Sequence, residues 1–286
     1  MAGVSRAIVV LGSVNLDLVA RVSRLPTPGE TVTGAALNRY PGGKGANQAL
    51  AARRLGARVY LVANVGRDAA ADEALQLVRD EGVDLSYCSA DDSMPTGIAL
   101  ISVADSGENQ IVVAPGANRT LSPERLRLPK ADALVCQLEI PAATLCRAAR
   151  EFAGFFCVNL APALEVPAEL IERADLVVMN QTEAAWYGNK VGRCQGLVAE
   201  TRGAEAASIS RHGRVIAEAV PPVVQSVDTV GAGDCFTAAL TLALIEGQAP
   251  HDALRFACAA GAIATTRPGA QPSMPDRASV EAMLRM

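Results

Sequence analysis

Continuous apolar runs that end in a polar side chain recur along this chain. The first run is Ala7–Leu11, and later runs end at Glu139, Asn159 and Asn180. Strands that are buried on both faces have such continuous apolar runs rather than an alternating pattern. Helical stretches separate most of these runs, which is typical of parallel strands joined by right-handed crossovers. The pattern therefore predicts an α/β fold with a mostly parallel central sheet.

Two further predicted strands complete this series of polar strand ends. The run 196–199 leads to Thr201, and the valines 223, 224 and 227 predict a strand that ends at Asp228. Ligands of open parallel sheets bind outside the carboxyl ends of the strands. The polar strand ends therefore predict a binding site along one edge of the sheet, although helix capping could account for any single one of them.

The segment 228–234 combines a glycine-rich turn with the predicted start of a long apolar helix, Cys235–Glu246. Gly231 and Gly233 allow close approach to the backbone, and the first amides of a helix attract anions. Asp234 adds a carboxylate beside this predicted anion site, where it could accept a proton from an attacking hydroxyl. The alternative is an aspartate that only caps the helix.

Two N-terminal segments carry polar groups suited to a hydroxylated ligand. Asn15 and Asp17 lie two residues apart, so an extended chain places both on one face. Lys44 and Asn47 follow the glycines of segment 42–48, at the predicted start of an alanine-rich helix. This segment lacks the spacing of a phosphate-binding P-loop. A solvent-facing strand and a plain glycine-rich connection remain the alternatives.

A β-hairpin is predicted between residues 96 and 113. The β-branched runs Thr96–Val103 and Gln110–Val113 flank a polar, turn-rich segment at 105–109. In a chain that is otherwise α/β, such a hairpin predicts a small lid or an interface. Its exposed face would need a cover, so we expect a homodimer.

Composition narrows the class of protein. The chain has 286 residues and a net charge of −4, and half of its residues are hydrophobic. Because it lacks a basic run, nucleic acid is not expected as its main partner. The longest apolar run, Phe236–Ile245, is too short to span a bilayer, so no membrane partner is expected. The N-terminus does not have the pattern of a signal peptide.

The seven cysteines are scattered, and none forms a Cys-x-x-Cys pair. This distribution predicts free thiols in a reducing, cytoplasmic environment rather than disulfides or a zinc site. The two histidines, His212 and His251, lie in polar, turn-like segments. A histidine-based catalytic triad is therefore not expected.

Taken together, these motifs resemble the ribokinase family of PfkB-type carbohydrate kinases over nearly the whole chain. The similar segments are 12–17, 28–31, 42–48, 136–139, 180–183, 228–234 and 269–273. The resemblance implies a three-layer α/β/α fold formed by a single domain, residues 1–286. It also implies a β-sheet lid built from about residues 14–40 and 95–115, which closes over the sugar and forms the homodimer.

The resemblance implies a site that phosphorylates the primary hydroxyl of D-ribose from ATP. Asp234 is the implied catalytic base, and the amides of Gly231, Ala232 and Gly233 the implied anion hole. The residues implied to bind the sugar are Asn15, Asp17, Gly43, Lys44, Asn47, Glu139 and Asp234. Those implied at the nucleotide are Asn180, Thr201, Arg202, Gly203, Gly233 and Cys258. Arg202 and Cys258 depart from the usual family residues, and the region 187–196 is shortened.

The resemblance also implies two metal ions. Magnesium would be organised through water by Glu183, with Asn180 nearby. Potassium would lie beside the anion hole, with ligands from Asp228, Val230, Thr265, Pro268, Ala270 and Ser273.

Three alternatives differ in the chemistry they require. A sister kinase could act on another sugar, a sugar acid or a nucleoside; a nucleoside kinase would need aromatic stacking, yet aromatic residues make up only 3% of this chain. A dinucleotide-binding oxidoreductase would need Gly-x-Gly-x-x-Gly after the first strand, which is not present. A sugar-binding protein without activity would not need the intact Asp234.

Overall fold

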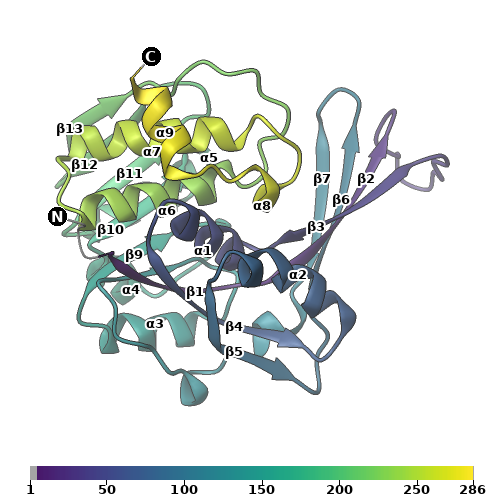
Figure 1. The fold of residues 1–286 in the computed structure, drawn as a ribbon, viewed down its shortest axis with the longest axis horizontal. Helices are drawn as coiled ribbons and strands as arrows, with labels where there is room; N and C mark the ends of the chain where they lie inside the picture. Colours follow the sequence, from purple (N-terminus) through teal and green to yellow (C-terminus); the bar gives the residue numbers. More distant parts are fainter. Residues whose placement is uncertain (1–4, 286) are drawn as a thin grey trace.

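The computed structural model describes residues 5–285 and contains a nine-stranded central sheet (Figure 1). The strand order is β13-β12-β11-β10-β9-β8-β1-β4-β5, and only the pairings β11–β12 and β12–β13 are antiparallel. The strands are β1 (Ala7–Leu11), β4 (Arg58–Gly66), β5 (Asp84–Asp91), β8 (Ala133–Cys136), β9 (Phe155–Asn159), β10 (Leu176–Asn180), β11 (Leu197–Thr201), β12 (Ala207–Arg211) and β13 (Arg214–Ala219). The predicted mostly parallel sheet is thereby confirmed.

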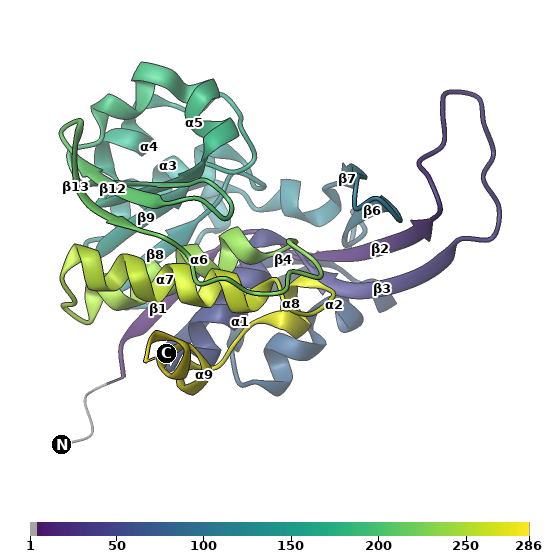
Figure 2. The same ribbon diagram turned by 90° about the horizontal axis from the view of Figure 1, so that it is seen from above.

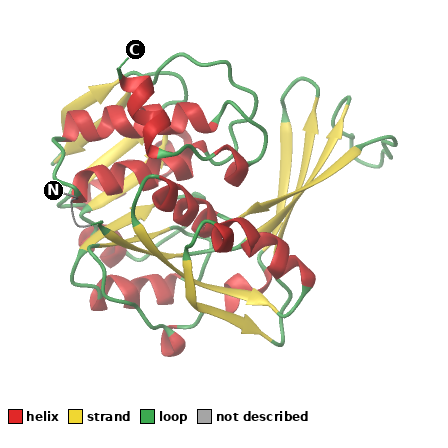
Figure 3. Ribbon diagram, viewed as in Figure 1, coloured by secondary structure: helices red, strands yellow, loops and turns green. Residues whose placement is uncertain are grey.

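Helices cover both faces of this sheet, which gives the three-layer architecture (Figures 2 and 3). The first face carries α1 (Lys44–Arg54), α2 (Ala69–Asp80), α6 (Ala232–Ile245) and α7 (Pro250–Ala264), with α8 (Ala270–Ser273) and α9 (Arg277–Leu284) beside them. The second face carries α3 (Ala142–Glu151), α4 (Ala168–Arg173) and α5 (Gln181–Tyr187). Short 3₁₀ turns lie at Gly116–Thr120, Pro123–Arg125 and Gly188–Arg193. The core between the layers is mainly alanine, valine and leucine.

A second sheet projects from the body of the molecule (Figure 1). Its order is β3-β2-β6-β7, with β2 (Asn15–Val22), β3 (Ala36–Gly42), β6 (Gly97–Ala104) and β7 (Asn109–Ala114). The hairpin β6–β7 confirms the predicted pair of strands, and β6 joins β2 in parallel. We call this four-stranded sheet the lid sheet. Because β2 begins only a few residues after β1, a short connection ties the lid sheet to the central sheet.

One predicted strand is wrong. No strand precedes Asp228, since residues 220–231 are irregular up to the start of α6. Pro221 and Pro222 have no amide hydrogen to donate to a strand ladder. Val223 is fully exposed, with a relative accessibility of 101%, so its apolar side chain marks no buried strand. Asp228 therefore lies in a loop rather than at a strand end.

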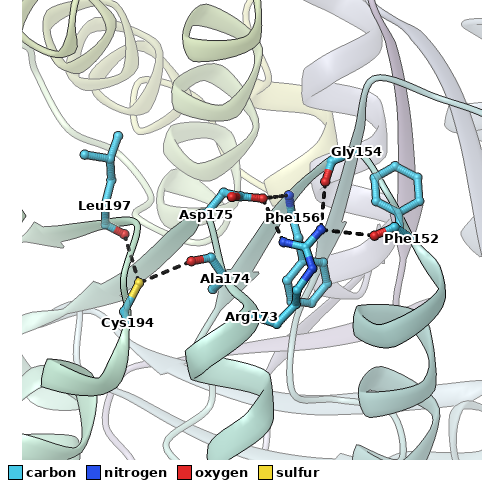
Figure 4. A network of polar contacts seen from close by, with 8 residues as sticks. All are labelled: Phe152, Gly154, Phe156, Arg173, Ala174, Asp175, Cys194 and Leu197. Carbon is cyan, nitrogen blue, oxygen red and sulfur yellow. Dashed lines mark hydrogen bonds and ion pairs between the residues drawn. The ribbon is translucent and has the colours of Figure 1, made fainter.

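A polar network ties β9 and β10 together at their N-terminal ends (Figure 4). Arg173 donates to Asp175 at 2.9 Å and to the carbonyl oxygen of Gly154 at 2.9 Å, and Asp175 also accepts from the Phe156 amide at 2.8 Å. The thiol of Cys194 donates to carbonyls on both sides, before β10 and at the start of β11. This network lies at the opposite edge of the sheet from the predicted binding site, so its role is structural.

The seven cysteines are free thiols, and all except Cys88 are buried. Within residues 5–285, none of the helices has the length and apolar character needed to cross a membrane.

Candidate active site

A cavity of about 200 Å³ opens at the carboxyl ends of β9, β10 and β11, beside the N-terminus of α6. The groups around it are Lys44, Asn159, Ala161, Val178, Met179, Asn180, Glu183, Thr201, Thr229, Gly231, Gly233 and Asp234. Seven of these residues were predicted from the sequence as site residues. The cavity therefore lies at the sheet edge where a parallel α/β fold binds its ligands.

Asp234 lies in the first turn of α6 and is almost completely buried, with 6% of its surface exposed. Each of its carboxylate oxygens accepts one side-chain amide: Nδ2 of Asn47 donates to Oδ2 at 2.9 Å, and Nε2 of Gln48 donates to Oδ1 at 3.0 Å. Burial raises the pKa of Asp234, although Lys44 and the Asn47 amide oppose that rise. Asp234 is thus a positioned carboxylate that is a better proton acceptor than an exposed one.

The glycines before Asp234 shape the start of α6. Gly231 is the N-cap and has φ = 82°, a backbone conformation that favours glycine. A Cβ on Gly231 would lie 2.7 Å from the Cβ of Ala270, whereas a Cβ on Gly233 would meet no atom within 4 Å. The Ala232 amide donates to the Thr229 carbonyl at 3.3 Å. The open space beside Gly233 is consistent with an anion at this helix end.

Asn15 and Asp17 both lie on β2 and are buried. The side chain of Asn15 accepts from Asn118 Nδ2 at 2.8 Å, which fixes its oxygen as the acceptor. Asp17 lies against Gly42, where any side chain would overlap the carboxylate. Burial, followed by Glu139 and Asp234, raises the pKa of Asp17 to about 7. The carboxylates of Asp17, Glu139 and Asp234 therefore influence one another in a poorly solvated region.

Glu139 follows β8 and joins the start of α1 to the β1–β2 connection. Its Oε2 accepts from the hydroxyl of Ser13, and from the backbone amide of Lys44 at 3.3 Å. Gly43 supplies φ = 86° just before the helix, and a Cβ there would lie 2.6 Å from the amide nitrogen of Asn15. These contacts place the predicted sugar-binding segments side by side.

Several carboxylates act electrostatically on the ammonium of Lys44. Burial lowers the pKa of Lys44, but Asp234, Glu139, Glu183 and Asp17 outweigh it, so that the pKa is raised above the ordinary value. Lys44 is therefore charged and partly neutralises a cluster of acids. A cation at this position also suits a phosphate or a sugar hydroxyl.

Asn180 and Glu183 form a capping box at the start of α5. The Asn180 side chain accepts from the Glu183 amide at 2.9 Å, and Glu183 Oε2 accepts from the Asn180 amide at 2.8 Å. Burial raises the pKa of Glu183. Among the described residues, no three His, Cys, Asp or Glu side chains cluster as metal ligands. A magnesium ion that is bound through water and substrate phosphates needs no such cluster, so Glu183 fits this use.

The loop around Asp228 is tied to the segment 265–273. Asp228 accepts from the amides of Val230 at 3.0 Å and Gly269 at 2.9 Å, and its own amide donates to the Thr265 carbonyl at 3.1 Å. Ser273 donates to the Ala270 carbonyl at 2.8 Å. All six groups predicted for potassium, Pro268 included, offer oxygen donors, which is the chemistry that a hard monovalent cation needs.

Three residues predicted at the nucleotide lie outside the lining of this cavity. Arg202 pairs with Glu200 at 2.9 Å, and Gly203 forms a turn with φ = 61°. Cys258 is buried in α7, where its thiol lies 3.8 Å from the Ala219 carbonyl oxygen.

Several polar residues of this region had no individual role in the sequence prediction. Gln48 contacts Asp234, and it also bonds to Gln137 and Asn159. Gln48 and Gln137 stand inside motifs that were used for the family resemblance, and Asn159 is one of the polar strand ends. Asn118, which binds the Val14 backbone and Asn15, follows the hairpin with no pattern that marks it.

Comparison with known proteins identifies the family to which this chain belongs. The sequence signature of the "pfkB family carbohydrate kinase" matches residues 5–277. The chain belongs to the PfkB family of carbohydrate kinases. It is 36% identical to proteins named ribokinase from Haemophilus influenzae, over 95% of this chain and 96% of that protein, and from Bacillus subtilis, over 98% and 99%.

Solved structures of relatives match the fold of this PfkB kinase. The crystal structure of ribokinase from Thermotoga maritima has a TM-score of 0.89 and 32% identity, and it covers 98% of this chain and all of that one. The ribokinase of Arabidopsis thaliana, solved in a complex with ribose and ATP, has a TM-score of 0.87 and 31% identity, with coverage of 99% and 100%. The fold of a PfkB carbohydrate kinase is therefore confirmed.

Proposed function

We propose that this protein is an ATP-dependent ribokinase that phosphorylates the primary hydroxyl of D-ribose to give ribose 5-phosphate. The observation that carries the proposal is the position of Asp234. Its carboxylate is bonded to Asn47 on the predicted sugar side and lines the cavity at the start of α6 on the predicted phosphate side. Relatives named ribokinase, one of them solved with ribose and ATP, support this substrate pair.

The proposed reaction forms one bond and breaks one. The sugar hydroxyl oxygen attacks the γ-phosphorus of ATP, the bond to the β–γ bridging oxygen breaks, and ADP leaves with that electron pair. Asp234 accepts the hydroxyl proton, a contribution of about 10²–10⁴-fold in rate. The backbone amides of residues 231–233 stabilise the charge of the transferred group, and one such donor can be worth about 3–4 kcal/mol.

The sugar-binding residues orient the hydroxyl toward that carboxylate. The residues assigned to the sugar are Asn15, Asp17, Gly43, Lys44, Asn47 and Glu139. Lys44 also neutralises charge between sugar and phosphate. The residues assigned to the nucleotide are Asn180, Thr201, Arg202, Gly203, Gly233 and Cys258. Of these, Asn180, Thr201 and Gly233 line the cavity. Closure of the lid sheet would exclude water, which otherwise competes as the acceptor.

Two cations complete the proposed site. Glu183 would organise magnesium through water, and a potassium ion would be bound by Asp228, Val230, Thr265, Pro268, Ala270 and Ser273. When bound, these ions would supply positive charge beside the phosphates.

The lid sheet is the proposed dimer interface. Leu100, Ile111, Val112 and Val113 are exposed apolar side chains on β6 and β7, with 46–65% of their surfaces accessible. Leu100 and Val112, which pair across β6 and β7, lie on one face of the lid sheet, and Ile111 and Val113 lie on the other. Exposed apolar side chains on an edge strand are suited to a contact surface. The seven free cysteines support a reducing, cytoplasmic location.

The second candidate is a sister kinase with another sugar, a sugar acid or a nucleoside as acceptor. Against a nucleoside, which would need aromatic stacking, aromatic residues make up only 3% of this chain. The test is an assay of ATP consumption with D-ribose, other pentoses, hexoses, sugar acids and nucleosides, with and without potassium. The proposal requires D-ribose to give the highest kcat/KM, and a higher value for any other acceptor would contradict it.

A further inference from the structure

A chain of buried side-chain amides runs from Gln137 through Gln48 to Asp234. Nε2 of Gln137 donates to Oε1 of Gln48 at 2.6 Å. Nε2 of Gln48 then donates to Oδ1 of Asp234 at 3.0 Å and to Oδ1 of Asn159 at 3.2 Å. Gln48 and Gln137 are completely buried, and Asn159 is 6% exposed. Such a chain is expensive to bury unless its members bond to one another.

The orientation of Asn159 determines which groups donate and which accept in this series of hydrogen bonds. Nδ2 of Asn159 donates to the Val178 carbonyl at 3.1 Å, so the Asn159 oxygen faces Gln48. The Gln48 nitrogen therefore faces two acceptors, and its oxygen faces the donor of Gln137. A rotated Gln48 amide would point its oxygen at the carboxylate and lose all three bonds. The side chain has only one satisfied orientation, with its N–H groups toward Asp234.

We infer that Gln48 is a positioning residue for the catalytic base, and that Gln137 and Asn159 fix its orientation. Gln48 holds Oδ1 of Asp234 while Asn47 holds Oδ2, so the carboxylate cannot rotate and is stabilised in the ionised form. This inference rests on the proposed role of Asp234 as base. Asn47 is assigned to the sugar, whereas Gln48, one residue later on α1, has no sugar-binding role assigned to it.

Four charged groups around Asp234 influence its ionisation and therefore the pH profile of kcat. They are Lys44 from α1, Asp17 from β2, Glu139 from the segment after β8, and Glu183 from α5. Lys44 favours ionised Asp234, while the three carboxylates oppose it. Removal of a donor from Asp234 leaves these four groups in place and favours the protonated form. The acid limb of kcat must then move to higher pH.

The test replaces Gln48 by the similarly shaped methionine in the full chain. A hydrogen bond to a charged group is worth about 1.5–3 kcal/mol, so Gln48→Met is expected to lower kcat about 10- to 100-fold at neutral pH. The acid limb of the pH profile of kcat should move to higher pH by about one unit or more. The KM for ribose should change less than about threefold. Gln137→Met leaves the donor to Asp234 in place, and it should change kcat in the same direction but by less.

Each outcome decides the inference. A folded Gln48→Met enzyme with an unchanged kcat and acid limb would overturn it, and so would a loss confined to KM. If Gln48→Met does not fold, Gln137→Met decides alone, and an unchanged acid limb and kcat there would overturn the inference. A wild-type protein that phosphorylates none of the sugars would instead refute the proposed function.

Discussion

The ring of Tyr40, on β3 of the lid sheet, lies against the backbone of Gly269, where a Cβ would come within 2.7 Å of Cδ1. Gly269 in turn donates its amide to Asp228, which accepts from Val230 just before α6. The lid sheet is thereby in contact with the loop proposed to bind potassium. A change at this glycine should therefore affect both stability and nucleotide use.

We predict that Gly269→Ala destabilises the protein by about 1–3 kcal/mol, because φ = 80° with ψ = 141° is a conformation essentially reserved for glycine. The contact with Tyr40 adds to this cost. Urea unfolding measures the free energy of unfolding, and the KM for ATP should rise as well. Gly247→Ala is the matched control, since φ is 89° there and no atom lies within 4 Å. An equal loss in both variants would contradict a role for the Tyr40 contact.

Asp234→Asn should reduce kcat by about 10²–10⁴-fold, because the amide cannot accept the hydroxyl proton. The KM or Kd for ribose should change little, since Asn15, Asp17 and Glu139 remain. Steady-state kinetics and calorimetric titration with ribose measure the two effects separately. A variant with near-normal turnover would remove Asp234 as the base.

Gly233→Ala should separate folding from phosphate binding. The new methyl group would enter open space, and alanine within a helix is about 0.5–1 kcal/mol more favourable than glycine. Stability should therefore be unchanged or higher, while the methyl group occupies the proposed phosphate position and lowers kcat/KM for ATP. Thermal unfolding and kinetics on one preparation check both statements. Normal kinetics in the variant would place the phosphate elsewhere.

Asp17 should make the free enzyme less stable as the pH rises from about 4 to about 7. Its pKa is about 7 in the folded protein and 3.8 as the ordinary value, so the folded state binds more protons across this window. Each unit of such a shift corresponds to about 1.4 kcal/mol. Asp234 and Glu183 have raised pKa values too, so the informative quantity is the difference between wild type and Asp17→Asn.

For Asp17→Asn, urea unfolding at pH 5 and pH 8 should show a smaller loss of stability than the wild type. Asp84→Asn is the control, because hydrogen bonds with Ser86 lower the pKa of Asp84 and it titrates below this window. An identical pH dependence in Asp17→Asn and wild type would contradict the raised pKa.

The lid sheet should be the surface that makes the dimer. Ile111 and Val112 are adjacent on β7 and point to opposite faces, so replacement of both by glutamate charges both faces. The double variant should be monomeric by light scattering, while the wild type is dimeric. Val215 and Ile216 on β13, an edge strand of the central sheet, are matched control residues, exposed by 58% and 47%. If the β13 double variant dissociates and the β7 variant does not, the lid is not the interface.

Sequence patterns predicted the elements whose burial leaves a clear signature. Strands such as Ala7–Leu11 and the helix at 235–246 follow directly from apolar runs, and so does the hairpin β6–β7. The antiparallel pair β12 and β13 was missed because its side chains alternate between buried and exposed over only a few residues. The strand predicted before Asp228 does not form, because the two prolines that precede the apolar valines have no amide hydrogen to donate to a strand ladder.

The candidate site was predictable where a motif brings several polar groups together. Asn15, Asp17, Asn47 and Asp234 are each visible in short patterns, and the fold places them around one region. The contacts of Gln48 could not be predicted, since its partners at 137, 159 and 234 come from three different elements. Only the three-dimensional arrangement shows which of two neighbouring amides, Asn47 or Gln48, bonds to which carboxylate oxygen.

Asp234 is bonded to side chains 187 and 186 positions earlier in the chain. During synthesis, therefore, the proposed base is among the last parts of the candidate site to emerge, long after the segments assigned to the sugar. A chain that stops before α6 carries the sugar-binding side chains without the carboxylate, and a C-terminal fragment carries the carboxylate without the amides that orient it. We therefore expect that neither piece of an interrupted or cleaved chain catalyses the proposed phosphoryl transfer.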